Sequence, residues 1–208
     1  MALQSARPCG DFRTSYASDL TIFPTRNSFL ALVIGLALLA LAPAFFDRYA
    51  LSILILIGIY GIAALGLNLL TGCTGQISLG HAAFFGLAAF ASTYFNNNWG
   101  VPVALSIPLG GLVATVVGMV VGLPAARIKG LYLAIATLAA QYILEDFFAR
   151  AEWFTGGAGG AFANPYSLFG FAFTGEKLYF YVVLAHVVVL YVYAANLLRT
   201  RDGRAFVA

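Results

Sequence analysis

The chain has 208 residues, of which 62% are hydrophobic and only 9% are charged, and its net charge is +3. A soluble domain averages about 45–50% apolar and about 25% charged residues, so this composition argues against a water-soluble globular protein. In a bilayer, backbone polar groups must be satisfied internally, which only helices and closed barrels achieve. Barrel strands would alternate over ~10 residues, whereas this chain has long unbroken apolar runs. We therefore predict an all-α, polytopic transmembrane helix bundle.

Residues 1–27 are mostly polar, and we expect them to form a cytoplasmic N-terminal tail. A membrane-crossing helix needs about 20 mostly apolar residues, which gives about six spans over residues 28–198, the predicted transmembrane domain. The predicted spans are Ser28–Phe46, Ala50–Thr71, Ile77–Phe95, Pro102–Leu123, Leu131–Ala149 and Leu178–Leu198. Residues 199–208 then begin a cytoplasmic loop.

The basic residues predict the orientation of the chain, because cytoplasmic loops carry an excess of Lys and Arg. If the N-terminus is inside, most basic residues fall on the inner side: Arg7, Arg13, Arg26, Arg127, Lys129, Arg199, Arg201 and Arg204. The outer side then holds only Arg48, Arg150 and Lys177. This bias predicts that both termini are cytoplasmic.

A polar, glycine-rich stretch interrupts the apolar pattern at Asn68–His81 (NLLTGCTGQISLGH). One interpretation is a plain turn, which Gly and polar residues favour. The other is a broken or re-entrant segment that enters a transport path, since irregular backbone at membrane depth occurs only where protein or a watery cavity covers it. Interrupted helices also mark the binding sites of many transporters.

The fifth predicted span carries Thr137, Gln141 and Glu145 four residues apart, on one helix face. Lipid contact would be costly for this stripe, so we expect it to face the bundle interior, either as part of a path or as contact between helices. Glu145 lies near the outer end and could also reach water. The substrate-path candidates from the interruption and this stripe are Asn68, Thr74, Gln76, Ser78, His81, Thr137 and Gln141.

The fourth predicted span repeats a small residue every four positions, at Gly110, Ala114, Gly118 and Gly122. Small residues on one face let helices approach closely, so we expect a tightly packed ridge. In the sixth span His186 lies near the middle, and we expect a neutral ring hydrogen-bonded to a neighbouring helix rather than a proton relay.

Enzymatic chemistry has little support in the sequence. Thr155–Gly160 (TGGAGG) lacks the Lys and Ser/Thr of a Walker motif, so we expect the chain to bind no ATP. Cys9 and Cys73 lack metal-binding spacing and are read as free thiols. With neither paired carboxylates nor a nucleophile and base in the spans, we expect no enzyme activity, no bound cofactor and no metal. The absence of a basic run interleaved with aromatic residues argues against nucleic acid as a partner.

Three stretches resemble the permease subunits of bacterial ATP-binding-cassette importers for branched-chain amino acids. They are Gly66–Gly86 (GLNLLTGCTGQISLGHAAFFG), Arg127–Ala139 (RIKGLYLAIATLA) followed by Trp153–Gly157 (WFTGG), and Arg199–Phe206 (RTRDGRAF). The matches run in family order and cover the chain roughly from Leu51 onward. Two departures are Cys73, where many relatives carry an aromatic residue, and the end of the chain at Ala208, before the ATPase-docking segment of longer relatives. The resemblance therefore suggests a C-terminally truncated member.

The resemblance implies a multi-pass protein of the bacterial inner membrane that forms a path for leucine, isoleucine, valine or related solutes. It implies four kinds of partner: a second permease subunit, cytoplasmic ATP-binding subunits that use ATP, a periplasmic amino-acid-binding protein and membrane lipid. The predicted ATPase-facing residues are Arg127, Lys129, Arg199, Arg201 and Arg204. The alternative is a gradient-driven secondary transporter or channel for a small solute. Its main candidates for a coupling site are Glu145, Asp146 and His186.

Overall fold

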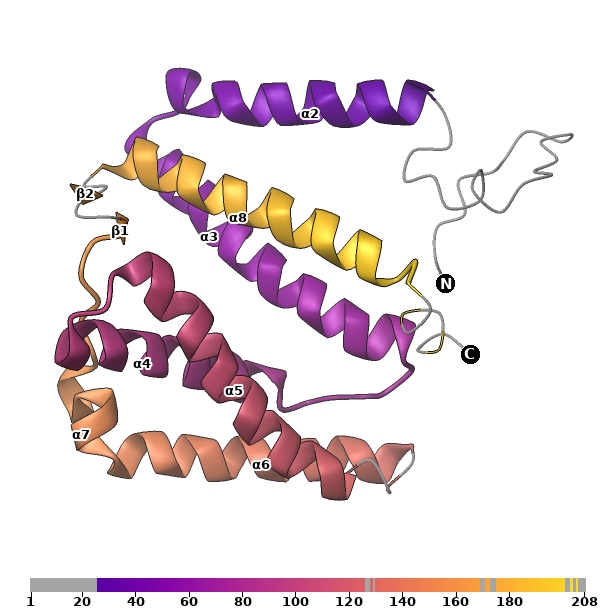
Figure 1. The fold of residues 1–208 in the computed structure, drawn as a ribbon, viewed down its shortest axis with the longest axis vertical. Helices are drawn as coiled ribbons and strands as arrows, with labels where there is room; N and C mark the ends of the chain where they lie inside the picture. Colours follow the sequence, from indigo (N-terminus) through magenta and orange to yellow (C-terminus); the bar gives the residue numbers. More distant parts are fainter. Residues whose placement is uncertain are drawn as a thin grey trace, which may run out of the picture. The chain divides into compact units, whose positions relative to one another are not determined.

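The computed structural model describes residues 26–125, 128, 130–168, 171–172, 175–200, 203 and 205. Six long helices fill most of this part of the chain (Figure 1): α2 (Arg26–Phe45), α3 (Arg48–Leu67), α4 (His81–Trp99), α5 (Val103–Ala125), α6 (Leu131–Arg150) and α8 (Glu176–Leu197). The short elements are the π-helix η1 (Asn68–Cys73), α7 (Glu152–Thr155), the 3₁₀ turn η2 (Gly157–Gly159), β1 (Ser167–Leu168) and β2 (Phe171–Ala172). The two strands form a minimal antiparallel hairpin, in which Ser167 lies opposite Ala172. The predicted helical, membrane-spanning class is confirmed.

Four of the described helices are long and apolar enough to cross a membrane: residues 48–73, 103–125, 131–150 and 176–197. They correspond to the second, fourth, fifth and sixth predicted spans. The apolar part of α2, Phe29–Phe45, is shorter. The third predicted span was wrong at its start, because residues 77–80 are not helical and α4 runs from His81 to Trp99. Helix α4 begins with a histidine and carries three asparagines just before its last residue, Trp99.

The chain divides into two units, residues 1–65 with 180–208 and residues 66–179. In the first unit, Ala42 of α2, Leu51 and Ile55 of α3, and Phe180 and Val183 of α8 form one buried cluster. The hydroxyl of Tyr181 donates a hydrogen bond to the carbonyl of Ala40 (2.9 Å). This polar contact fixes α8 to α2 beside Pro43, which interrupts the hydrogen-bond ladder of α2.

His186 also lies in this unit, and its Nδ1 is 2.8 Å from the carbonyl oxygen of Val182, one turn earlier in α8. A neighbouring helix was the predicted partner of this ring. The contact that the structure gives for Nδ1 is within its own helix.

The second unit is built on α4 and α5, and Figure 1 shows the two helices crossing. At the crossing, a β-carbon placed on Gly110 would lie only 2.3 Å from the carbonyl oxygen of Ala88, so the two backbones are in contact. Ser92 and Ser106 share a hydrogen bond of 3.0 Å beside it. Helix α6 packs on α4 through a buried cluster of Ala83, Leu87 and Leu144.

The small-residue ridge of α5 is only partly packed. Gly110 meets backbone, and Ala114 packs on the buried cluster of α4 and α6. Gly118 has only ordinary contact distances to the ring of Phe84, the nearest being 3.9 Å, and a β-carbon on Gly122 would meet no described atom within 4 Å. Among the described residues, the predicted tight packing is therefore found at Gly110 and Ala114, where α4 crosses α5, and not at Gly118 and Gly122.

Candidate translocation-path site

The polar interruption predicted at Asn68–His81 is a genuine break in the helical structure. Helix α3 continues into the π-helix η1, whose wider turns are frequent at functional sites. The carbonyl groups at this helix end are satisfied locally. Thr71 Oγ1 donates to Leu67 O (2.8 Å), Thr74 Oγ1 donates to Leu70 O, and the N–H of Gln76 also donates to Leu70 O (3.3 Å). The hydroxyl of Thr74 therefore caps backbone.

Residues Thr74–Gly80, which we call the broken segment, have no helical structure. Gly75 has a φ of +67°, in the left-handed region that favours glycine, and it turns the chain out of the π-helix. At the far end, the N–H of Leu79 donates to Thr137 Oγ1 of α6 (3.0 Å). A β-carbon on Gly80 would lie 2.2 Å from the carbonyl oxygen of Thr137, so only glycine fits there.

This contact lies well within α6. Thr137 is six residues after Leu131, which corresponds to about 9 Å along the helix axis. Since α6 is long enough to cross a membrane, the broken segment meets it below the helix end. His81 then starts α4 beside Gly66 of α3, where a β-carbon would be 3.5 Å from His81 Nε2. The segment therefore packs against the side of a membrane-capable helix, and its interpretation as a broken segment of a transport path stays a prediction.

The structure brings some of the predicted path residues together and leaves others apart. Thr137 joins the broken segment directly, whereas Gln141, one turn further along α6, donates from Nε2 to Glu145 Oε1 (2.8 Å). Asn68 and Gln76 are exposed, and Ser78 and His81 are half-buried. Along the α6 stripe, Thr137 and Gln141 are half-buried and Glu145 is exposed, so burial decreases toward the end of the helix.

The predicted ATPase-facing residues Arg127, Lys129, Arg201 and Arg204 lie outside the described residues. Arg199 is half-buried in the turn that follows α8, where its N–H donates to Asn196 O (3.1 Å).

Sequence reasoning missed the structure at the other end of the second unit. Residues Ala151–Leu168, which we call the capping loop, fold over the end of α4. Asn97 Nδ2 donates to Phe162 O (2.9 Å), Asn164 Nδ2 donates to Asn96 Oδ1 (2.8 Å), and the N–H of Val103 donates to Ser167 Oγ (3.3 Å). The glycines of TGGAGG were the available signal, since Gly156, Gly157 and Gly160 all have positive φ.

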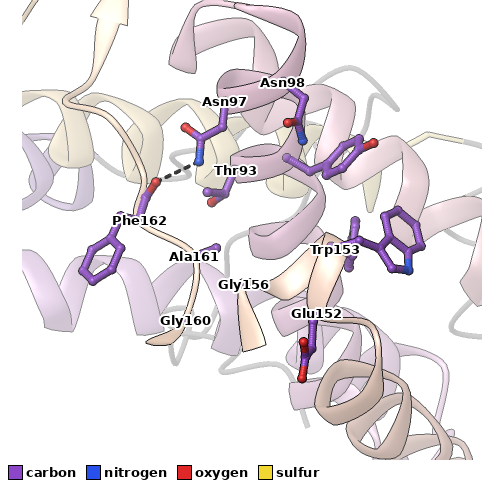
Figure 2. Close-up of a pocket in the computed structure, with 11 residues that line it drawn as sticks. Thr93, Asn97, Asn98, Glu152, Trp153, Gly156, Gly160, Ala161 and Phe162 are labelled. Atoms are coloured by element: carbon purple, nitrogen blue, oxygen red, sulfur yellow. Dashed lines mark hydrogen bonds between the residues drawn. The ribbon is translucent and has the colours of Figure 1, made fainter. Parts of the chain in front are cut away.

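A shallow hollow of about 310 Å³ lies between the capping loop and α4 (Figure 2). Thr93, Asn97 and Asn98 line it from α4, and the loop contributes Glu152 to Phe154, Gly156 and Gly160 to Phe162. In Figure 2 the rings of Trp153 and Phe162 point away from its centre. The exposed side chains of Trp99 and Trp153 are typical of a membrane–water interface.

The comparisons with known proteins agree with the membrane helices. The family described as branched-chain amino acid transport system / permease component matches residues 49–208. The chain belongs to this family. It is a transport-protein family, so the predicted class of protein is confirmed, and the membrane-capable helices place the chain in the bacterial inner membrane.

Two curated relatives are named as permease proteins of branched-chain amino acid transport systems. The chain is 31% identical over 201 residues to the high-affinity branched-chain amino acid transport system permease protein LivM of Escherichia coli K12. It is 32% identical over 200 residues to the protein of the same name from Salmonella typhimurium LT2. The alignments cover 85% and 83% of this chain but 47% of each relative, so the chain spans about half their length. No solved structure matches the chain significantly.

Proposed function

We propose that this chain is a permease subunit that forms part of the translocation path for branched-chain amino acids in an ATP-driven importer. Membership of the permease family supports the role, and the names of the two curated relatives support the solute class. The observation that carries the proposal is the broken segment. An irregular backbone at the depth of Thr137 is tolerated in a membrane protein only where protein or a water-filled cavity covers it.

The path residues remain part of the proposal: Asn68, Thr74, Gln76, Ser78, His81, Thr137 and Gln141. The exposed amides of Asn68 and Gln76 offer both donors and acceptors, which suit the charged ends of an amino acid. Thr74 and Thr137 contribute differently, since their hydroxyls hydrogen-bond to backbone at the break. They shape the path rather than present free groups to a solute.

The energy source is proposed to come from partners. We propose that cytoplasmic ATP-binding subunits use the ATP, with Arg127, Lys129, Arg199, Arg201 and Arg204 facing them. We further propose that a second permease subunit completes the path and that a periplasmic amino-acid-binding protein delivers the solute. The basic bias of the inner loops supports this orientation, with both termini in the cytoplasm.

Uptake by the reconstituted complex tests the proposal. Proteoliposomes would contain the chain, the second permease subunit and the ATP-binding subunits, with binding protein and radiolabelled leucine on the opposite side from ATP. We expect uptake that requires both ATP and the binding protein, and that unlabelled isoleucine and valine suppress. ATP-binding subunits with the Walker lysine replaced are the matched control and should give none.

The gradient-driven alternative makes the opposite prediction. If uptake continued without ATP and stopped when an ionophore removed the ion gradient, the importer assignment would be overturned. If an amide or urea suppressed the uptake and isoleucine did not, the assignment as an ATP-driven importer would stand and the proposed solute class would change.

A further inference from the structure

The broken segment is attached at its two ends to different helices. At the first end, Thr74 and Gln76 hydrogen-bond to Leu70 of η1, so this part belongs to the π-helix that continues α3. At the second end, Leu79 and Gly80 lie against Thr137 of α6. Between them, Gly75 is left-handed, and no described atom lies within 4 Å of where its β-carbon would be. Gln76 and Ile77 are exposed.

The hydroxyl of Thr137 serves two backbone groups at once. It donates to the carbonyl of Ala134 in its own helix (2.9 Å) and accepts from the N–H of Leu79 (3.0 Å). A threonine hydroxyl has one hydrogen to donate and two lone pairs, so its donor is already used. Without this acceptor, the N–H of Leu79 would lose the partner that holds it against α6. The hydroxyl therefore links the first turns of α6 to the break.

The close approach of Gly80 to the backbone of α6 adds a second contact between the broken segment and α6. A β-carbon on Gly80 would lie 2.2 Å from the Thr137 carbonyl oxygen, so the backbone of the broken segment lies close against α6 at this point. The hydrogen bond and the contact both converge on one residue, six positions after the start of α6. A shift of the first turns of α6 would therefore carry Leu79 and Gly80 with it, while Gly75 allows the other end to stay with α3.

We propose that Thr137 is a positioning residue that makes the broken segment follow the movement of α6. This inference rests on the proposed transport function, because it assigns the segment's movement to the transport cycle. It is more specific than the sequence expectation that Thr137 lines the path, since the hydroxyl hydrogen-bonds to backbone on both sides. A solute-binding threonine would govern the solute concentration for half-maximal uptake, whereas a positioning threonine governs the maximal rate.

The first test needs no transport. In a background with Cys9→Ser and Cys73→Ser, a Ser78→Cys substitution places a thiol in the half-buried part of the broken segment. In the purified full chain, Thr137→Val should raise the maleimide labelling rate of this thiol at least about fivefold, because Leu79 loses its acceptor. Thr137→Ser keeps the hydroxyl and should leave the rate within about twofold. Thr115→Val, on an exposed threonine that bonds only its own helix, is the matched control and should change nothing.

The second test uses the complete importer in proteoliposomes with ATP, binding protein and leucine. Thr137→Val should lower the maximal uptake rate about tenfold and leave the half-saturating concentration unchanged, and Thr137→Ser should restore the rate. Should Thr137→Val instead raise the half-saturating concentration at an unchanged maximal rate, Thr137 would be a solute ligand and the proposal would be wrong. Loss of function in Thr137→Ser, which retains the fold and the hydroxyl, would also overturn it. Absence of uptake by the unsubstituted complex would defeat the proposed function alone, because the labelling result stands independently of it.

Discussion

The second unit contains two glycine-rich stretches that resemble each other in sequence and differ in structure. In the capping loop, Gly156, Gly157 and Gly160 form a tight turn, and a β-carbon on Gly156 would lie 2.5 Å from Gly160 O. In the broken segment, Gly75 has the same left-handed backbone, but a β-carbon there would meet no described atom within 4 Å beyond its chain neighbours. Glycine thus permits close backbone packing at Gly156 and at Gly80, and a left-handed turn in open space at Gly75.

The side chains around the two stretches differ in the same way. Asparagine, serine and threonine side chains fix the capping loop at several points, and Phe154 packs its ring against Tyr94, Phe147 and Trp153. The far end of the broken segment depends on Thr137 and Gly80. We infer that the capping loop is the fixed end of this unit and that the broken segment is the part that can move.

The largest expected effect is a difference in cysteine labelling from outside the cell, which reports which end of the second unit faces the periplasm. In a background with Cys9→Ser and Cys73→Ser, we expect Ala163→Cys in the capping loop to react with a membrane-impermeant maleimide in intact cells. Ala205→Cys should react only after the membrane is opened, because the basic residues favour a cytoplasmic C-terminus. Both side chains are exposed, so labelling reports sidedness rather than burial. The reverse pattern would invert the topology.

A large effect is expected where α5 crosses α4. Gly110→Leu should destabilise the chain by about 3 kcal/mol, because even its β-carbon would collide with the backbone of Ala88. The matched control is Gly122→Leu on the same helix, where the space is open and we expect a change below about 0.5 kcal/mol. Thermal unfolding of the detergent-purified variants measures both. Equal destabilisation by the two substitutions would show that the second half of α5 is also covered.

A smaller effect is expected in the capping loop. The side chain of Thr155 is buried, and its hydroxyl lies within hydrogen-bond distance of the carbonyls of Phe148 (2.9 Å) and Ala151 (3.1 Å). Thr155→Val should cost about 1–2 kcal/mol, because buried carbonyls lose their donor, and should speed proteolysis within the loop. The labelling rate of Ser78→Cys in the broken segment should not change. A parallel rise in that rate would refute the separation of the two regions.

The sequence predicted the helices well because membrane-spanning segments are recognised by length and apolar composition alone. The start of the third span was wrong for the same reason. Ile77 and Leu79 are apolar, yet they lie in the broken segment and are exposed in this chain. The position at which α4 begins is set by the contact of Gly80 with Thr137, which joins residues 57 positions apart and leaves no periodic trace.

The candidate site was predicted in part. Polar composition located the break and four-residue spacing located the stripe of α6, but neither indicates which group a hydroxyl bonds. Thr137 was therefore read as a path residue, and the structure adds its bond to Leu79. Spacing likewise placed Gly110 and Gly122 on one face of α5 without showing that α4 covers only the first. The capping loop was missed because its order depends on asparagine bonds between distant parts of the chain.

The polarity of α4 has a consequence for how the protein is made. This helix carries His81 at its start and three asparagines near its end, and such polar residues disfavour the insertion of an isolated segment into lipid during synthesis. Its partner α5 is strongly apolar, and the pair shares the backbone contact at Gly110 and the hydrogen bond between Ser92 and Ser106. We therefore expect α4 to leave the insertion machinery together with α5, as a helical hairpin. The close crossing at Gly110 would then hold α4 and α5 together during membrane insertion, as well as in the folded protein.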